Sequence, residues 1–387
     1  MTQLLLAVIY ATFISLGLPD ALLGSAWPTM YQQFGVPLSY AGAVSTITCA
    51  GTIVSSLQSD RLVKRLGSGR MTAYSVMLTA LGLFGFSISS SFWQLCLWAV
   101  PYGLGAGGVD AALNHYVALH YASRHMSWLH CMWGIGASTG PYIMGWALTR
   151  GQMWNMGYRY IAIFQVMMTL FLFLSLPLWK QQKQICQKAD GQAEPLSFRT
   201  VMSIGGAREI MLTFFCYCAL EQTTGLWAAS YLVLKGSLTA GEAAVSAGLF
   251  YLGMTIGRAV SGFLTFKLND AHMIRLGVCV IVLGVLAMLL PLGAVSARGG
   301  LFLVGLGCAP IYPSIIHSIP SLFGAEKSQA IIGIQMASAY VGFCVMPPLF
   351  GLIANHISTA LLPVFLFAIL LAMGGMHEKL LKKVRPT

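Results

Sequence analysis

Charged side chains are scarce in this chain. Asp, Glu, Lys and Arg make up only 9 % of its 387 residues, whereas 57 % are apolar, and the mean hydropathy is +0.74. A chain of this composition has too little polar surface to cover a water-soluble globule. The shortage of charge therefore excludes a soluble protein and predicts an integral, multi-pass membrane protein surrounded by a lipid bilayer.

Several functional signatures are also missing. The net charge of +11 comes from basic residues scattered through short loops, with no aromatic-interleaved patch, so we expect no nucleic-acid partner. The nine cysteines lie mostly in apolar segments and form no paired CxxC motifs, which excludes a disulfide framework or a zinc site. No paired-carboxylate or Cys–His arrangement supports catalysis. We therefore predict neither an enzyme nor a bound cofactor.

Four histidines recur at every fifth position, but their spacing does not predict a metal site. They are His115, His120, His125 and His130. Five residues rotate a helix by about 140°, so neighbouring members of the run do not converge on one point. The run also crosses a predicted loop, and we expect no bound metal.

Twelve long apolar segments fill the chain almost from end to end. A membrane-spanning helix needs roughly 20 mostly apolar residues, and each segment is long enough. The predicted spans lie near 4–30, 38–60, 70–90, 93–121, 127–149, 157–179, 207–234, 241–266, 272–292, 299–322, 328–354 and 358–377. We predict an all-α membrane protein with twelve transmembrane helices in two pseudo-symmetric six-helix bundles, 1–179 and 207–387, joined by a polar cytoplasmic linker, 180–206. The second bundle ends in a short cytoplasmic tail.

Lys and Arg are distributed unevenly between the loops. If the N-terminus is cytoplasmic, seventeen of the 22 basic residues fall in cytoplasmic segments and four on the opposite side. Because Lys and Arg favour cytoplasmic loops, we predict that both termini are cytoplasmic. The expected location is a cytoplasmic (inner) membrane of the bacterial type.

The two halves of the chain resemble each other. At an offset of about 202 residues, 103–105 (Gly-Leu-Gly) corresponds to 305–307 with the same sequence. With one residue less of offset, Asp20 corresponds to Glu221. Two related six-helix halves predict a pseudo-two-fold axis along the membrane normal, a solute site between the halves, and alternating access to that site from the two sides.

Three acidic residues lie inside predicted spans: Asp20, Asp110 and Glu221. A carboxylate in hydrocarbon costs several kcal/mol unless it is paired, hydrated or protonated, so intramembrane acids usually line a solute or ion pathway. A low-dielectric cavity favours the neutral acid, which can load and release a proton. We hypothesise that Asp20 and Asp110 carry coupling protons, the alternative being an acid paired with a basic side chain or helix end. For Glu221, a second proton site, a solute ligand and a partner for Arg258 all remain open.

The turn after the second span, 59–70, holds an acid followed by basic and glycine residues. It resembles the loop 2–3 signature of the major facilitator superfamily, with two extra residues between the acid and the following glycine. In that family the acid caps a neighbouring helix and pairs with basic groups. The resemblance implies a conformational latch formed by Asp60, Arg61 and Arg65, with Arg258 in a weaker second-half counterpart. The alternative is a solvated turn that obeys the positive-inside rule.

The fourth span contains a glycine-rich run, 103–108, followed by Asp110 and Asn114. No strand precedes the run, which excludes a nucleotide loop, and its glycines let helices approach closely. The four-residue spacing puts Asp110 and Asn114 on one helical face. The pattern resembles the Glu-Thr-Ala-Ala-Asn stretch of fucose-permease-like sugar:proton symporters, which also have an acid in helix 1 where Asp20 stands. The resemblance implies proton-coupled uptake of a neutral sugar or polyol, by a monomer.

A sugar site needs hydrogen-bonding groups and aromatic faces within the spans. The candidates are Asn114, His115, His130, Gln222, His317 and Gln335, with Trp27, Trp133, Trp227, Tyr312 and Tyr340 as aromatic faces. Each aromatic residue has an alternative role in helix packing or as an interface anchor.

The expected partners of the chain are a small solute, protons and lipid. Rival functions are proton-driven efflux of amphipathic compounds, a membrane receptor that keeps the fold without transporting, and facilitation without protons. Hydrogen-bonding groups around a small pocket would favour sugar, whereas a wide cavity rich in aromatic residues and Met would favour efflux.

Overall fold

The structure is a computed structural model that describes residues 2–121, 123–180, 198–235 and 237–384. Within these ranges the regular elements are helices, and there is no strand. Contacts divide the chain into two units, which we describe separately. Unit 1 comprises Met1–Gly191 and Thr239–Gly248, and unit 2 comprises Gln192–Leu238 and Leu249–Thr387.

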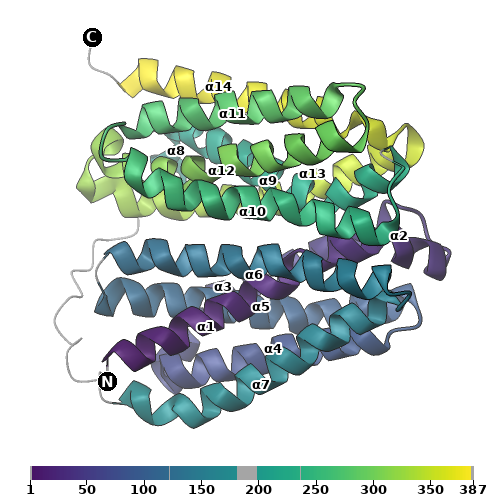
Figure 1. Ribbon diagram of the computed structural model, residues 1–387. Coiled ribbons are helices and arrows are strands. Elements are labelled where there is room, and N and C mark those ends of the chain that lie inside the picture. The colour runs from purple at the N-terminus through teal and green to yellow at the C-terminus, as the bar shows by residue number, and fades with distance from the viewer. Residues whose placement is uncertain (1, 122, 181–197, 236, 385–387) are drawn as a thin grey trace. The chain divides into compact units, whose positions relative to one another are not determined.

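Unit 1 is a bundle of long helices (Figure 1). Its elements are α1 (Thr2–Asp20), α2 (Leu22–Phe34), α3 (Tyr40–Leu66), α4 (Ser68–Ile88), α5 (Phe92–His120), α6 (Ser123–Thr149) and α7 (Trp154–Lys180). The first turns of α10 (Ala240–Leu264) also belong to this unit. The core contains apolar side chains of α1, α4, α5, α6 and α7, including Phe13, Leu113 and Leu129.

Unit 2 contains the rest of α10 and the other described helices after residue 197. They are α8 (Phe198–Met202), α9 (Ala207–Leu234), α11 (Asp270–Leu289), α12 (Ala294–Phe323), α13 (Ala325–His356), the 3-10 turn η1 (Thr359–Leu361) and α14 (Leu362–Val384). The predicted division at 180–206 stays a prediction. Within that stretch 181–197 lie outside the described residues, and α8 occupies part of the remainder.

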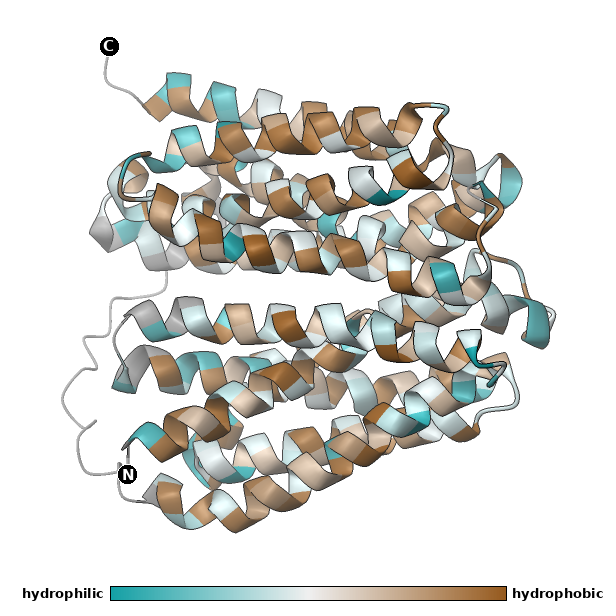
Figure 2. Ribbon diagram, in the orientation of Figure 1, coloured by the Kyte–Doolittle hydropathy of each residue, from teal (hydrophilic) through white to brown (hydrophobic). Residues whose placement is uncertain are grey.

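The helices confirm the predicted all-α class. Nine segments of the described chain are long and apolar enough to cross a membrane, the first being Gln3–Phe34. The remaining long helices, α5, α6 and α9, carry mid-helix polar side chains and coincide with three further predicted spans. Figure 2 shows apolar residues along the lengths of the helices and hydrophilic ones mainly near the helix ends.

The first predicted span differs from the expectation because it is broken. α1 ends at Asp20, Ala21 forms a turn, and α2 starts at the next residue. Pro19 has no N–H to donate to the carbonyl of Ser15, four residues earlier. The side-chain amide of Gln165, on α7, donates to that carbonyl instead, at 2.7 Å. A neighbouring helix thus satisfies the backbone that the proline leaves unpaired, as broken membrane helices require.

The glycine run of α5 seats the helix between two neighbours. A Cβ added at Gly103 would overlap the carbonyl oxygen of Thr48 on α3, and one at Gly105 would lie 2.5 Å from the carbonyl oxygen of Ser75 on α4. Real Cβ atoms essentially never come that close to another heavy atom. The run is therefore a helix-packing device, as the sequence predicts.

The same packing recurs in unit 2 at the predicted offset. A Cβ at Gly305 would overlap the carbonyl oxygen of Phe250, and one at Gly307 would lie 2.6 Å from that of Gly277. Phe250 and Gly277 follow Thr48 and Ser75 by the same 202 residues that separate the glycines. The internal repeat is thus visible in atomic contacts inside each unit.

Ion pairs join helices of unit 2 near their ends. Arg275 of α11 donates to both oxygens of Glu378 on α14, at 2.6 and 2.8 Å. Lys383 of α14 donates at 2.5 Å to the carboxylate of Glu209, near the start of α9. The Glu209 side chain is only 5 % exposed, whereas Lys383 is 47 % exposed. These pairs fix the end of α14 against α9 and α11.

Candidate functional site

Asp20 is bonded to two helices at the break in the first span. Its Oδ1 accepts a hydrogen bond from the hydroxyl of Tyr102 on α5 at 3.1 Å. Its Oδ2 accepts one from the indole Nε1–H of Trp133 on α6 at 2.6 Å. The side chain of Asp20 is exposed, whereas Tyr102 is buried. Both carboxylate oxygens are therefore directed at side chains of unit 1.

Close helix packing places the two donors. A Cβ at Gly17, three residues before Asp20, would overlap the carbonyl oxygen of Trp133, so α1 and α6 touch at this height. A Cβ at Gly82 of α4 would lie 2.6 Å from the Cβ of Tyr102. Small residues at both points let the helices come near enough for the indole and the phenol to reach one carboxylate.

Asp110 and Asn114 form the predicted pair on one face of α5. The Asn114 side-chain amide donates to Asp110 Oδ1 at 2.9 Å and to the Asp110 carbonyl at 3.0 Å. Both side chains are partly buried. The pair lies about two turns after Tyr102 on the same helix. α5 therefore carries both a hydrogen-bond donor to Asp20 and the second candidate acid.

Glu221 of α9 lies among aromatic and basic side chains of unit 2. It is partly buried, and Arg258 of α10 interacts with it electrostatically. One turn earlier, the ring of Tyr217 stacks on Phe214 at 6.2 Å and lies 6.1 Å from the ring of Tyr312. Proton binding, solute binding and pairing with Arg258 all stay open as roles of Glu221, and Arg258 is close enough to interact with it electrostatically.

Gln335 of α13 is a buried amide with unpaired atoms. Its side chain is 0 % exposed, and neither its nitrogen nor its oxygen has a hydrogen-bond partner in the described part of the chain. Buried polar groups are otherwise paired in most proteins, and an unpaired one costs free energy. Gln335 therefore has hydrogen-bonding capacity that a solute with hydroxyl groups can use.

Two of the predicted aromatic candidates have packing roles. Trp27 and Trp227 are both 0 % exposed. The indole N–H of Trp27 donates to the Leu38 carbonyl at 2.7 Å, and that of Trp227 donates to the Pro347 carbonyl at 2.9 Å. Burial and a satisfied N–H fit the alternative packing role of both residues, and their role in solute binding stays a prediction.

The three histidine candidates have different surroundings. His317 Nδ1 is hydrogen-bonded to the carboxylate of Asp270 at 2.9 Å, and its side chain is 84 % exposed, so this contact lies near the surface of unit 2. His130 meets the ring of Phe13 edge-on at 6.1 Å, and His115 is exposed. Within the described residues, no three His, Cys, Asp or Glu side chains gather as metal ligands.

The remaining candidates all belong to unit 2. Gln222 is partly buried beside Glu221, and the Tyr312 hydroxyl donates to Met336 Sδ at 3.9 Å. Tyr340 packs against Phe343, with ring centroids 6.4 Å apart.

The predicted latch stays a prediction. The side chain of Asp60 lies outside the described residues, Arg61 and Arg65 are exposed at the end of α3, and Arg258 interacts with Glu221.

Tyr102 and Gln165 are absent from the predicted set. Tyr102 is one of 15 tyrosines, and Gln165 stands in an apolar helix with no motif around it. A signal for Gln165 does exist, because a proline inside a span leaves a carbonyl that some neighbouring donor must satisfy. No comparable pattern marks Tyr102.

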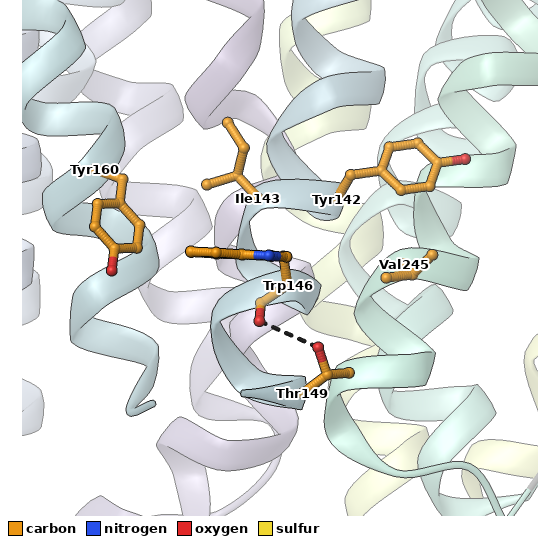
Figure 3. A pocket seen from close by; sticks show the side chains of 6 residues that line it. All are labelled: Tyr142, Ile143, Trp146, Thr149, Tyr160 and Val245. Atoms are coloured by element: carbon orange, nitrogen blue, oxygen red, sulfur yellow. Dashed lines mark hydrogen bonds between the residues drawn. The ribbon is translucent and has the colours of Figure 1, made fainter. Parts of the chain in front are cut away.

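A separate apolar cavity of ≈ 640 Å³ lies beside α6 (Figure 3). It is lined by Tyr142, Ile143, Trp146, Thr149, Tyr160 and Val245. The ring centroids of Trp146 and Tyr160 lie 5.8 Å apart, and the Arg150 guanidinium lies 4.9 Å from the centroid of the Trp146 ring. None of the predicted site residues lines this cavity, so it is distinct from the Asp20 cluster.

Comparison with known proteins gives consistent results. The sequence profile of the family described as Major Facilitator Superfamily matches residues 8–328. The chain is 22 % identical to the glucose/mannose transporter GlcP of Bacillus subtilis, covering 92 % of this chain and 90 % of that protein. It is 25 % identical to the 3-(3-hydroxy-phenyl)propionate transporter of Escherichia coli, covering 83 % and 79 %.

Solved structures also match. A crystal structure of a peptide transporter, POT, in complex with sulfate aligns with a TM-score of 0.74 at 14 % identity, covering 97 % of this chain and 93 % of that one. A likeness this distant in sequence concerns the fold alone.

Proposed function

The chain belongs to the Major Facilitator Superfamily, and we propose that this transporter takes up a neutral sugar or similar small polar solute together with protons. Membership makes it a membrane transporter of small solutes rather than an enzyme. The proposal adds proton coupling, the class of solute, alternating access, and a cytoplasmic (inner) membrane location with both termini cytoplasmic, as a monomer.

The hydrogen-bonded Asp20 carries the proposal. An ionised acid inside a membrane is costly and usually marks an ion or solute pathway, and transporters place their ion sites where a spanning helix is interrupted. Asp20 meets both conditions, since it ends α1 at the break and is exposed. Its two recorded hydrogen bonds come from a phenol and an indole. These donors hold the carboxylate in place, and a carboxylate that accepts hydrogen bonds can still take up a proton.

Hydrogen-bonding capacity supports a polar solute. Gln335 offers an unpaired amide, and Asn114 presents an amide beside Asp110. Sugar hydroxyls that lose water on entry must regain such partners. The transporter of glucose and mannose among the relatives supports the same class. Efflux of amphipathic compounds remains the rival that the experiment must separate.

Uptake into proteoliposomes tests the proposal. With the interior alkaline by one pH unit, coupling of one proton to one neutral solute can drive a roughly tenfold accumulation. We expect wild-type protein to accumulate one of a panel of labelled sugars and polyols, and Asp20→Asn and Asp110→Asn to lose accumulation. Asp270→Asn, which changes an acid at the start of α11, is the matched control and should retain it.

Two results would overturn the proposal. Undiminished uphill uptake in both acid variants would remove the acids from coupling. Export of amphipathic dyes with no uptake from the sugar panel would establish the rival function.

A further inference from the structure

The two oxygens of the Asp20 carboxylate have partners of different chemical capacity. Oδ2 faces the indole N–H of Trp133, which can donate a hydrogen bond but cannot accept one. Oδ1 faces the hydroxyl of Tyr102, which can do both. A proton placed on Oδ2 would point at another hydrogen, whereas a proton placed on Oδ1 meets an oxygen lone pair once the phenol O–H rotates.

We propose that the coupling proton binds to Oδ1 of Asp20, and that Tyr102 is the positioning residue that reverses from donor to acceptor when the proton arrives. The inference rests on the proposed function. In the step, the carboxylate gains one proton and becomes a carboxylic acid. The new O–H at Oδ1 donates to the Tyr102 oxygen, whose own hydrogen turns away and stays on the phenol. No other bond forms or breaks.

The packing around Tyr102 suits this reversal. The side chain is only 7 % exposed, its Cβ lies against Gly82, and its ring lies 5.9 Å from that of Phe86. The ring is therefore held while the hydroxyl hydrogen remains free to rotate about the C–O bond. Trp133 is anchored by the close approach of its carbonyl to Gly17. Its bond to Oδ2 survives in both protonation states.

Protonation then changes one inter-helix contact and leaves the other. The link from Asp20 to α6 through Trp133 is the same before and after, whereas the link to α5 through Tyr102 reverses direction. α5 also carries Asp110, about two turns further along. A proton at Asp20 therefore changes a hydrogen bond made by the helix that also holds the second candidate acid.

Among the titratable groups on the helices packed against α1, His125 on α6 shares a hydrogen bond with the Tyr10 hydroxyl of α1 at 2.8 Å. Asp110 on α5 is bonded to Asn114, and His130 on α6 faces Phe13. Arg159 on α7 is exposed. Tyr102 donates a hydrogen bond to Oδ1 of Asp20.

Tyr102→Phe tests the inference because it removes one oxygen atom and keeps the ring. We expect proton-driven accumulation of the solute to fall roughly tenfold or more, as loss of a hydrogen bond to a charged group predicts. Counterflow of labelled solute at equal pH, which needs no net proton movement, should stay within about threefold of wild type. Tyr160→Phe removes the same oxygen from a tyrosine outside the Asp20 cluster, whose hydroxyl donates to Gln152; it is the matched control and should keep accumulation.

Infrared difference spectra on the whole protein give a second readout that needs no solute. On acidification, the tyrosine C–O band should shift in wild type. The shift should be missing in Tyr102→Phe and in Asp20→Asn. A shift that persists in Tyr102→Phe, or accumulation by Tyr102→Phe equal to wild type, overturns the inference. If Asp20→Asn abolishes accumulation but Tyr102→Phe does not, the proposed function stands and the inference about Tyr102 fails. Undiminished accumulation by Asp20→Asn contradicts both the proposed function and the inference.

Discussion

Gln335→Leu should stabilise the empty transporter and weaken solute binding at the same time. The amide is 0 % exposed and both its polar atoms are unpaired within the described chain. A buried unsatisfied polar group costs about 1–3 kcal/mol. Leucine has a similar volume and removes that cost, while its imperfect packing destabilises the protein by less than about 1.5 kcal/mol. The expected gain in unfolding free energy is about 1–2 kcal/mol.

The internal repeat supports leucine at this position. A Cβ at Gly342 of α13 would lie 2.8 Å from the carbonyl oxygen of Phe215, and Gly136 of α6 meets the carbonyl of Ile14 in the same way. The residue that occupies the place of Gln335 in unit 1 is then Leu129, which is fully buried in the core. An ordinary core residue therefore stands where unit 2 has the amide.

Solute affinity should move in the opposite direction. If the amide hydrogen-bonds solute hydroxyls, its removal costs about 1–3 kcal/mol, or roughly 10–100-fold in Kd. The assay pairs a denaturant titration of the solute-free protein with equilibrium binding of the labelled sugar.

Gln165→Leu is the matched control for this prediction. It removes another buried, unpaired amide oxygen but leaves the Ser15 carbonyl without its donor, so the two effects offset and the free energy of unfolding should change by less than about 1 kcal/mol. A lower denaturation midpoint for Gln335→Leu, or an unchanged Kd, would refute the reasoning.

Two predictions concern the packing and the ion pairs of the fold. Glu209→Gln removes the ion pair with Lys383 and should lower the free energy of unfolding. The loss should be only about 1 kcal/mol, because Lys383 is half exposed and can be hydrated instead. Equal denaturation midpoints for the variant and the wild type would contradict this. Gly103→Ala should destabilise by about 1–3 kcal/mol through overlap with α3, while Gly375→Ala, with no atom within 4 Å, should be neutral or stabilising by up to about 1 kcal/mol. Equal melting temperatures for the Gly103→Ala and Gly375→Ala variants would show that the close approach of α3 at Gly103 is not the cause of destabilisation.

Much of the fold could be predicted from the sequence because a bilayer imposes one strong pattern. The lengths of the apolar segments predicted where the long helices lie, and the glycine run of α5 predicted that neighbouring helices pack closely there. The break at Ala21 was missed, since hydropathy averages over 18 residues or more and does not register one turn inside an apolar stretch.

The site could be predicted only in part. Acids inside spans are rare enough to mark Asp20 and Asp110 directly. Their partners depend on which helices touch and at what height, so Tyr102 could not be told from the other tyrosines. Trp27 and Trp227 were named by residue type alone, yet the backbone carbonyls they bind lie 11 and 120 residues away.

Proton movement on addition of solute tests the central claim most directly. Wild-type protein in unbuffered liposomes, with equal pH on both sides, should make the outer medium more alkaline when saturating sugar is added outside. Asp20→Asn should take up sugar to equilibrium without that change. Sugar entry by wild type with no change in external pH, or an equal change in the variant, would contradict a coupling role for the acid.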